Sequence, residues 1–179
     1  MISPKLFYEV LINNGVSFFA GIPDSLLKEF CSYLDNSETN LSHIIASNEG
    51  TAIALAVGHH LVNGGLPMVY LQNSGLGNTI NPLLSLSDKE VYSIPLILLI
   101  GWRGEPGLKD EPQHLKQGRV TPALLDAMEI PYKLITKDLQ KSISNTKWAA
   151  QLALNSSSPV ALLVQKDSFN KNQIIKSKR

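Results

Sequence analysis

The stretch HIIASNEGTAIALAVGHH, residues 43–60, contains the step from strand to helix on which the fold assignment rests. An apolar run of strand length, expected to be buried, is followed at Glu49 by an Ala- and Gly-rich run of helix length. A carboxylate between two apolar elements is costly to bury in its charged form, unless a partner satisfies it or it takes up a proton. Glu49 is therefore either an acid at the start of a helix that faces solvent or a group that takes part in chemistry.

Outward from this stretch, the chain alternates between helix and strand patterns. Apolar runs predict strands at residues 16–22, 41–47, 67–74, 94–102, 132–136 and 159–165. Helices are expected at residues 4–14, 23–36, 49–65, about 78–87, 121–130 and 138–156, the first with Ser3 as its cap and Pro4 at its first position. Continuous apolar strands separated by helices are typical of a parallel sheet flanked by helices on both faces. The predicted fold class is therefore α/β.

Composition limits the function classes. The 179 residues are 44% hydrophobic and 17% charged, as in a globular protein with one substantial core. A formal net charge of +1 offers no basic surface for nucleic acid or an anionic membrane. The single cysteine, Cys31, lies among apolar residues and is expected to be a buried core thiol. The N-terminus lacks a signal-peptide pattern and no apolar run is long enough to span a bilayer, so a cytoplasmic setting is expected.

Unusual residues gather where predicted strands end. In parallel α/β sheets, ligands bind beyond the carboxyl ends of the strands. This rule selects four segments: AGIPDS, ASNEG, LQNSGLGNT and GWRGEPGLKDEPQH. We expect them to meet along one edge of the sheet.

Two motifs leave alternatives open. SGLGNT, residues 74–79, lacks the lysine of a phosphate-binding loop and does not match the dinucleotide fingerprint. It is either a glycine turn that lets the next helix pack closely or a ligand-lining loop, with Asn73 and Ser74 as polar contacts. His59 and His60 are adjacent on a helix without the spacing of a zinc motif, so structural or surface roles are favoured and no metal site is predicted.

The loop after the fourth predicted strand is dense in Gly, Pro and charge, and it ends at His114. Its charges nearly cancel, which fits a solvated loop with local ion pairs. The functional alternative is a closing lid whose cations meet an anionic substrate, with Gly101, Gly104 and Gly107 as hinges.

The segments GIPDS, SNEGTAIALAVGHHL, YLQNSGLGNTINPL and GWRGEPGLKDEPQH resemble the pyrimidine-binding domain of the thiamine diphosphate-dependent 2-oxo acid decarboxylases. The resemblance runs from about Met1 to Val164, and it predicts that domain at residues 1–166 with a polar, basic tail or interdomain linker at 167–179. Within the family, the nearest branch decarboxylates 3-phosphonopyruvate to phosphonoacetaldehyde and carbon dioxide. The alternatives are the alpha subunit of the branch acting on sulfopyruvate and a non-catalytic α/β binding domain.

The resemblance implies that Glu49 is catalytic and contacts the cofactor. In this family the corresponding glutamate hydrogen-bonds a ring nitrogen of the aminopyrimidine and favours the imino tautomer. The exocyclic nitrogen then removes the proton from the thiazolium carbon, and the cofactor accepts electrons as carbon dioxide leaves.

Further residues carry over from the family or are hypotheses of our own. His114 is expected to be catalytic, in a loop that elsewhere in the superfamily supplies histidines for proton transfer, and its neighbour Gln113 is expected to contact the substrate. The remaining expected cofactor contacts are Pro23, Asn73, Gly77 and Asn78, and the remaining expected substrate contacts are Asp24, Ser25, Arg103 and Lys109. Arg103 and Lys109 are our hypothesis for binding the phosphonate or sulfonate.

The sequence departs from the family in one respect. The family holds the cofactor's diphosphate through Mg²⁺ with a G-D-G segment and a following asparagine, and no such segment is present. The chain therefore carries half an active site, and a diphosphate-binding domain of the same enzyme or a beta subunit must hold Mg²⁺. We expect the chain to be catalytically inactive by itself. We expect the full enzyme to be a homo-oligomer that acts on a small 2-oxo acid.

Overall fold

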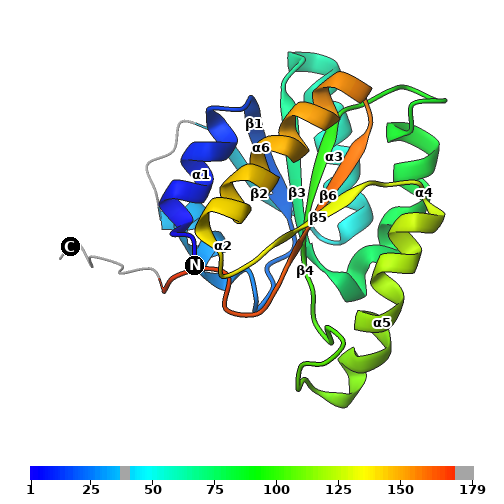
Figure 1. Cartoon of the computed structure of the whole chain (residues 1–179). Coiled ribbons are helices and arrows are strands. Elements are labelled where there is room, and N and C mark those ends of the chain that lie inside the picture. Colours follow the sequence, from blue (N-terminus) through cyan, green and yellow to red (C-terminus); the bar gives the residue numbers. More distant parts are fainter. Residues whose placement is uncertain (37–40, 172–179) are drawn as a thin grey trace.

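A parallel sheet organises the chain. The computed structural model describes residues 1–36 and 41–171, and its six strands lie in the order β2-β1-β3-β4-β6-β5 (Figure 1). The strands are β1 Val16–Gly21, β2 Ser42–Ile45, β3 Leu66–Gln72, β4 Leu96–Gly101, β5 Tyr132–Ile135 and β6 Pro159–Val164. The α-helices are α1 Pro4–Ile12, α2 Lys28–Asn36, α3 Glu49–Asn63, α4 Ile80–Pro82, α5 Pro112–Ala127 and α6 Leu139–Ser156. A 3₁₀-helix, η1 Asn73–Thr79, and a π-helical segment, η2 Leu83–Ser87, flank α4. The predicted α/β class with helices on both faces is confirmed.

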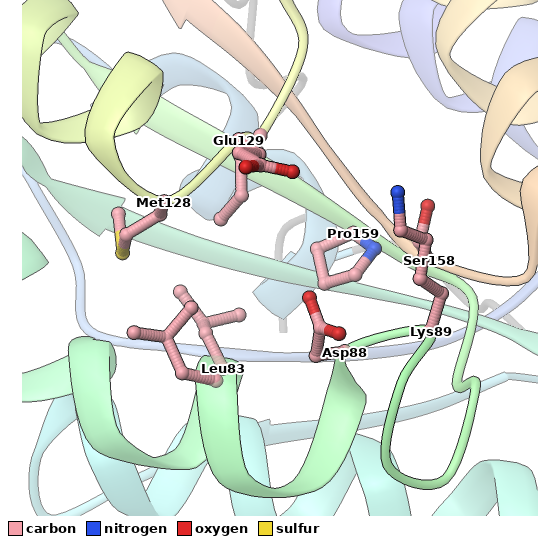
Figure 2. Close-up of a pocket in the computed structure, with 9 residues that line it drawn as sticks. Leu83, Asp88, Lys89, Met128, Glu129, Ser158 and Pro159 are labelled. Atoms are coloured by element: carbon pink, nitrogen blue, oxygen red, sulfur yellow. The ribbon is translucent and has the colours of Figure 1, made fainter.

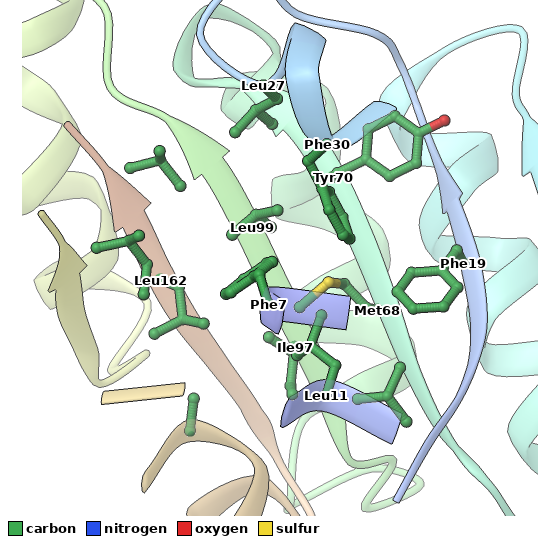
Figure 3. Packing of buried hydrophobic residues seen from close by; sticks show 14 of the residues in the cluster. Phe7, Leu11, Phe19, Leu27, Phe30, Met68, Tyr70, Ile97, Leu99 and Leu162 are labelled. Carbon is green, nitrogen blue, oxygen red and sulfur yellow. The ribbon is translucent and has the colours of Figure 1, made fainter. Parts of the chain in front are cut away.

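Each face of the sheet has its own core. Helices α1, α2 and α6 cover one face, and α3 and α5 cover the other (Figure 1). On the first face Phe7 and Phe30 meet edge to face, with ring centroids 5.1 Å apart (Figure 3). Cys31 packs in this same core, as predicted, and burial raises the pKa of its thiol to about 12. Its thiol is therefore a structural group.

Strand β2 corrects the prediction made for residues 41–47. It is an edge strand, and Ile44 and Ile45 are 39% and 55% exposed, so the run is not buried. An apolar run predicts a strand but does not tell an edge from the centre of a sheet. The carboxylate of Glu49 therefore follows a strand that lies open on the surface.

Two helices begin at other residues than predicted. Helix α2 begins at Lys28 and not at residue 23, because the Asp24 carboxylate accepts the Leu26 N–H (2.8 Å) and forms a turn first. Helix α5 begins at Pro112 and not at residue 121, and proline at the first helical position is a start signal that the prediction missed. Gln113 and His114 thus lie in the first turn of a helix and not in a loop.

Packing against the core continues past residue 166. Ser168 and Phe169 are buried, and Phe169 bridges to Ile2 and packs against Phe7 and Phe30. The rest of the predicted tail, residues 172–179, lies outside the described residues. None of the described helices is both long and apolar enough to cross a membrane.

A chain of polar side chains attaches the edge strand to the sheet. The hydroxyl of Tyr70, on β3, lies 2.7 Å from His43 Nε2, and His43 Nδ1 lies 3.3 Å from Asp35 of α2. If His43 carries its proton on Nδ1, it donates to Asp35 and accepts from Tyr70, which satisfies all three groups. Burial lowers the pKa of His43, and Asp35 opposes this shift in part.

This network predicts a loss of stability in mild acid. Because the native pKa of His43 lies below its unfolded value near 6.5, the unfolded state binds more protons in the interval between the two. The free energy of unfolding should therefore fall as the pH drops from about 6.5 through the native pKa. We expect His43→Gln to flatten this dependence in urea unfolding between about pH 7 and 5. Burial also lowers the pKa of His59, so part of the slope should remain, and an unchanged slope in the variant would contradict the assignment.

Candidate active site

The four predicted segments meet at the carboxyl ends of the strands. Asn78, in η1, donates to Glu49 at the start of α3 (2.8 Å). Arg103, after β4, donates through Nη1 to Ser25 after β1 (2.8 Å). Asn73 donates to the backbone carbonyl of Arg103 (2.8 Å). The expectation that these segments share one edge of the sheet is confirmed.

Glu49 is fixed by backbone as well as by side chains. It is the first residue of α3, and Asn48 caps the helix by accepting the Thr51 N–H (2.8 Å). The carboxylate of Glu49 lies against the Cα of Gly75, where a Cβ would come within 2.2 Å of Oε1. Only glycine fits at position 75 without moving Glu49. The carboxylate is partly exposed, with Oε2 bound to Asn78.

Gly75 is the site residue that the sequence prediction missed. The prediction named Gly77, which is exposed and has open space where a Cβ would lie. One of the two interpretations of SGLGNT, a glycine turn that permits close packing, indicated such a role. The sequence did not show which glycine is closely packed or which residue it contacts. In the structure the closely packed glycine is Gly75, and the group that it contacts is the carboxylate of Glu49.

The side chain of Asn73 is buried and hydrogen-bonded within the protein. Its side chain is 1% exposed, and its amide donates to the Arg103 carbonyl and to Thr121 Oγ1 (3.0 Å) while accepting the Arg103 N–H (3.1 Å). A direct contact between Asn73 and a ligand would require these bonds to open. In this structure Asn73 instead joins the end of β3 to the loop after β4 and to α5.

The base of the loop after β4 is pinned to α5 through a proline. Pro122 lies inside α5 and has no N–H, so the Gly118 carbonyl one turn earlier lacks its helical donor. Trp102 supplies that donor through its indole N–H (2.9 Å). Leaving such a carbonyl unpaired would cost about 1–3 kcal/mol. The helix defect is thus the attachment point of the loop.

Glycines of this loop and of α5 pack closely at the base of the loop. A Cβ on Gly104 would lie 1.9 Å from the His114 carbonyl oxygen, and a Cβ on Gly118 would lie 1.7 Å from the Gly104 carbonyl oxygen. Gly101 is closed off by Asp24 Oδ2, 2.2 Å from where a Cβ would lie. Of the three proposed hinge glycines, only Gly107 stands in open space at the exposed tip. The geometry favours the alternative of a loop with local ion pairs over a lid hinged at its base.

Asp24 is the buried acid of this edge. It is 6% exposed, and its Oδ1 has no hydrogen-bond partner among the described residues. Burial raises the pKa of its carboxyl, and backbone N–H groups and the nearby Arg103 oppose this only in part. Because Oδ1 is itself buried, a ligand would reach it only after a movement of the surrounding residues.

The other predicted residues lie at the same edge with varied exposure. Pro23, Ser25, Gln113 and Lys109 are exposed, and His114 is half-buried. Ser74 accepts from Gln72 (2.6 Å). His59 stacks on Phe18 with ring centroids 4.5 Å apart, and His60 bonds the Gly65 carbonyl, so the structural roles expected for this pair are confirmed.

Two of the pockets differ in position and in size. One of about 220 Å³ lies at the strand-end edge, and Ser25, Arg103 and Lys109 are among its lining residues. Figure 2 shows a second pocket beside Pro159, the first residue of β6, with Leu83, Asp88, Met128 and Glu129 around it. Its volume is about 40 Å³, enough for water but not for a substrate. Pockets of about 300 and 440 Å³ lie beside Ala127 and beside Thr136, so size alone does not select a site. The strand-end pocket is the candidate binding site because the turn after β1 and the loop after β4, two of the four predicted segments, line it.

Comparisons with known proteins agree with this geometry. Residues 4–130 match the family described as "Thiamine pyrophosphate enzyme, N-terminal TPP binding domain". A phosphonopyruvate decarboxylase of Streptomyces viridochromogenes is 42% identical over 121 residues, which cover 68% of this chain and 30% of that protein. The sulfopyruvate decarboxylase subunit alpha of Methanococcus maripaludis is 34% identical over 92% of this chain and 95% of its own length. The chain thus spans about a third of the first relative and nearly all of the second.

A solved structure shows the same fold. A putative thiamin diphosphate-dependent enzyme from Mycobacterium smegmatis aligns with a TM-score of 0.71 at 19% identity, over 96% of this chain and 32% of that one. At this identity the match supports the fold alone.

The contact between Gly75 and Glu49 predicts a matched pair of outcomes. Gly75→Ala should destabilise the chain by about 1–3 kcal/mol, because the new methyl group overlaps the Glu49 side chain. Gly58→Ala, in the middle of α3 with open space around it, should stabilise by up to about 1 kcal/mol. Urea unfolding measures both.

A double variant tests the cause. Glu49→Ala combined with Gly75→Ala should recover most of the loss, because the overlapping side chain is gone. Equal losses in the single and double variants would show that Gly75 does not act through Glu49.

Proposed function

We propose, since the chain belongs to the thiamine pyrophosphate enzymes through their N-terminal TPP binding domain, that it is the pyrimidine-binding half of a thiamine diphosphate-dependent 2-oxo acid decarboxylase. The observation that carries the proposal is the placement of Glu49. Its carboxylate stands at the start of α3, backed by Gly75 and bound by Asn78, at the edge of the sheet where ligands bind.

The residues present fit one half of the cofactor. The Gly75 backbone sets the position of Glu49, and Gly77 and Asn78 are exposed beside it, so an aminopyrimidine has a carboxylate acceptor and an open approach. When bound, thiamine diphosphate supplies the electron sink for decarboxylation. In this proposal Glu49 holds the proton shared with the pyrimidine ring nitrogen, and Pro23 lies near the ring.

The described residues do not offer the other half. They contain no group of three His, Cys, Asp or Glu side chains placed to hold a metal ion. We propose that Mg²⁺ and the diphosphate are held by a second domain or subunit, since the sequence lacks the G-D-G segment that holds them in the family. The near-complete match to a subunit alpha supports a separate partner, and the match to one third of a longer decarboxylase supports a second domain.

Loss of carbon dioxide from a 2-oxo acid leaves a carbon that must gain a proton to become the aldehyde. His114, in the first turn of α5, is the proposed residue for moving that proton, and its neighbour Gln113 is a proposed substrate contact. Asp24 and Ser25 form the proposed substrate side of the site. Ser25 is exposed and accepts a hydrogen bond from Arg103, so it is open to a substrate, whereas the buried Oδ1 of Asp24 would meet a substrate only after the turn after β1 moves.

The proposed substrate is 3-phosphonopyruvate, converted to phosphonoacetaldehyde and carbon dioxide. Sulfopyruvate is the second candidate. Its support is the share of the relative's length that is matched, because the chain aligns with 95% of a subunit alpha named for that reaction. Both molecules carry an anionic group beyond the 2-oxo acid. Arg103 and Lys109, which line the strand-end pocket, are the proposed contacts for it.

Carbon dioxide release from phosphonopyruvate and from sulfopyruvate, measured side by side, tests the proposal. The assay uses the chain with its partner domain or subunit, Mg²⁺ and thiamine diphosphate. We expect turnover of one substrate and a loss of about 100-fold or more in Glu49→Gln, which keeps the shape of the side chain and removes its charge. Cofactor binding without turnover of either substrate would move the assignment to another 2-oxo acid. Neither binding nor turnover would identify a non-catalytic domain.

A further inference from the structure

The strand-end pocket is built from three turns of the chain. The turn after β1, the loop after β4 and the turn after β6 enclose about 220 Å³. Its charged groups come from the last two of these. The lining residues are Ser25, Leu26, Trp102, Arg103, Glu105, Leu108, Lys109, Asp110 and Lys166.

One edge of the Arg103 guanidinium is occupied by Asp110. Nε donates to Oδ2 (2.9 Å), and Nη2 donates to Oδ1 (2.5 Å), the side-on arrangement of a bidentate pair. Nη1 donates to Ser25 (2.8 Å). Of the five N–H groups of an arginine, this leaves one on Nη1 and one on Nη2. The side chain is 18% exposed, so the unused edge is available to a ligand in the pocket.

Asp110 in turn is fixed by the backbone of its own loop. It accepts the Gly104 N–H (2.7 Å) and the Glu111 N–H (2.8 Å), and Arg103 holds the pKa of its carboxyl well below the usual range. Asn73 fixes the Arg103 backbone from the other side. The guanidinium is therefore oriented before any ligand arrives, and this reduces the ordering cost of binding.

The charge of Arg103 is already balanced by Asp110, so the unpaired cations of the pocket are lysines. Lys109 and Lys166 both line it, and neither forms an ion pair within residues 1–36 and 41–171. Glu105 shares the pocket and receives a hydrogen bond from Gln165. Lys166 follows β6, a strand end that carries no recognisable motif in the sequence.

We propose that this pocket binds the anionic group of the substrate, with Asp110 as the positioning residue of Arg103 and Lys166 as an additional cation beside Lys109. The inference rests on the proposed function for the identity of the substrate. Arg103 supplies directed hydrogen bonds from its free edge, and the lysines supply the charge. The ligand class is a tetrahedral oxyanion, phosphonate or sulfonate, on a short carbon chain.

Binding of methylphosphonate and methanesulfonate to the full chain tests the subsite without catalysis. The readout is the NMR signal of the Arg103 Nε–H, which reports its hydrogen bond to Asp110. We expect a saturable shift in the wild type, and binding weakened about tenfold or more in Asp110→Asn and in Lys166→Met. Lys166 lies outside the loop that Asp110 organises, so its variant keeps the test valid if Asp110→Asn perturbs that loop.

Matched controls are Asp126→Asn and Lys147→Met, exposed residues on α5 and α6. They should bind both probes like the wild type. Wild-type affinity in Asp110→Asn would overturn the positioning role, and wild-type affinity in Lys166→Met would overturn the role of that lysine. No saturable shift in the wild type would overturn the subsite as a whole.

Kinetics of the assembled enzyme separates this inference from the proposed function. Asp110→Asn should raise KM for the anionic substrate about tenfold with a smaller change in kcat, because the lost contact acts in binding. If probe binding depends on Asp110 but the assembled enzyme decarboxylates neither substrate, the result would support the anion subsite and contradict the proposed reaction. A lower kcat with unchanged KM would contradict the positioning role.

Discussion

The close contact between a glycine backbone and a carboxylate is the constraint on which the site depends. Gly75 presents no side chain, so Glu49 lies directly against the chain that follows β3, and Asn78 of the same segment takes up its outer oxygen. A long acidic side chain at a helix start would otherwise sample several rotamers in water. Here its range is limited by steric contact on one side and a hydrogen bond on the other, which is the pre-organisation that catalysis by a positioned group requires.

A second device fixes the opposite side of the edge. A proline inside α5 removes one helical hydrogen bond, and the carbonyl that it leaves free accepts the indole N–H of Trp102. Close approach of Gly104 to α5 and the bonds of Asn73 add to this attachment. The loop that carries Arg103 is therefore part of the rigid scaffold, and only its tip around Gly107 is open. The structure thus offers fixed donors at this edge, and closure of the whole loop would require these contacts to break.

Sequence patterns predicted the layers of the fold because buried parallel strands are continuous apolar runs and the helices between them carry clear start and stop signals. They wrongly predicted that β2 is buried, because an apolar run such as Ile44 and Ile45 has the same pattern on an edge strand as in the centre of a sheet. They also placed the start of α5 too late, because charge and glycine density concealed Pro112 as a first helical residue. The strand-end rule brought Ser25, Glu49, Asn78 and Arg103 together correctly. Which glycine backs Glu49, and which acid holds Arg103, are matters of packing and side-chain geometry that spacing in the sequence does not encode.

The most direct test of the central claim is the exchange of the cofactor's thiazolium C2 proton with deuterated water, measured in the assembled enzyme without substrate. This rate isolates the step in which Glu49 is proposed to act and is independent of which 2-oxo acid is the substrate. The account predicts fast exchange in the wild type and a rate lower by about 100-fold or more in Glu49→Gln, with the cofactor still bound. Equal rates in the two proteins would contradict it, and would leave Glu49 as an acid that only begins a helix.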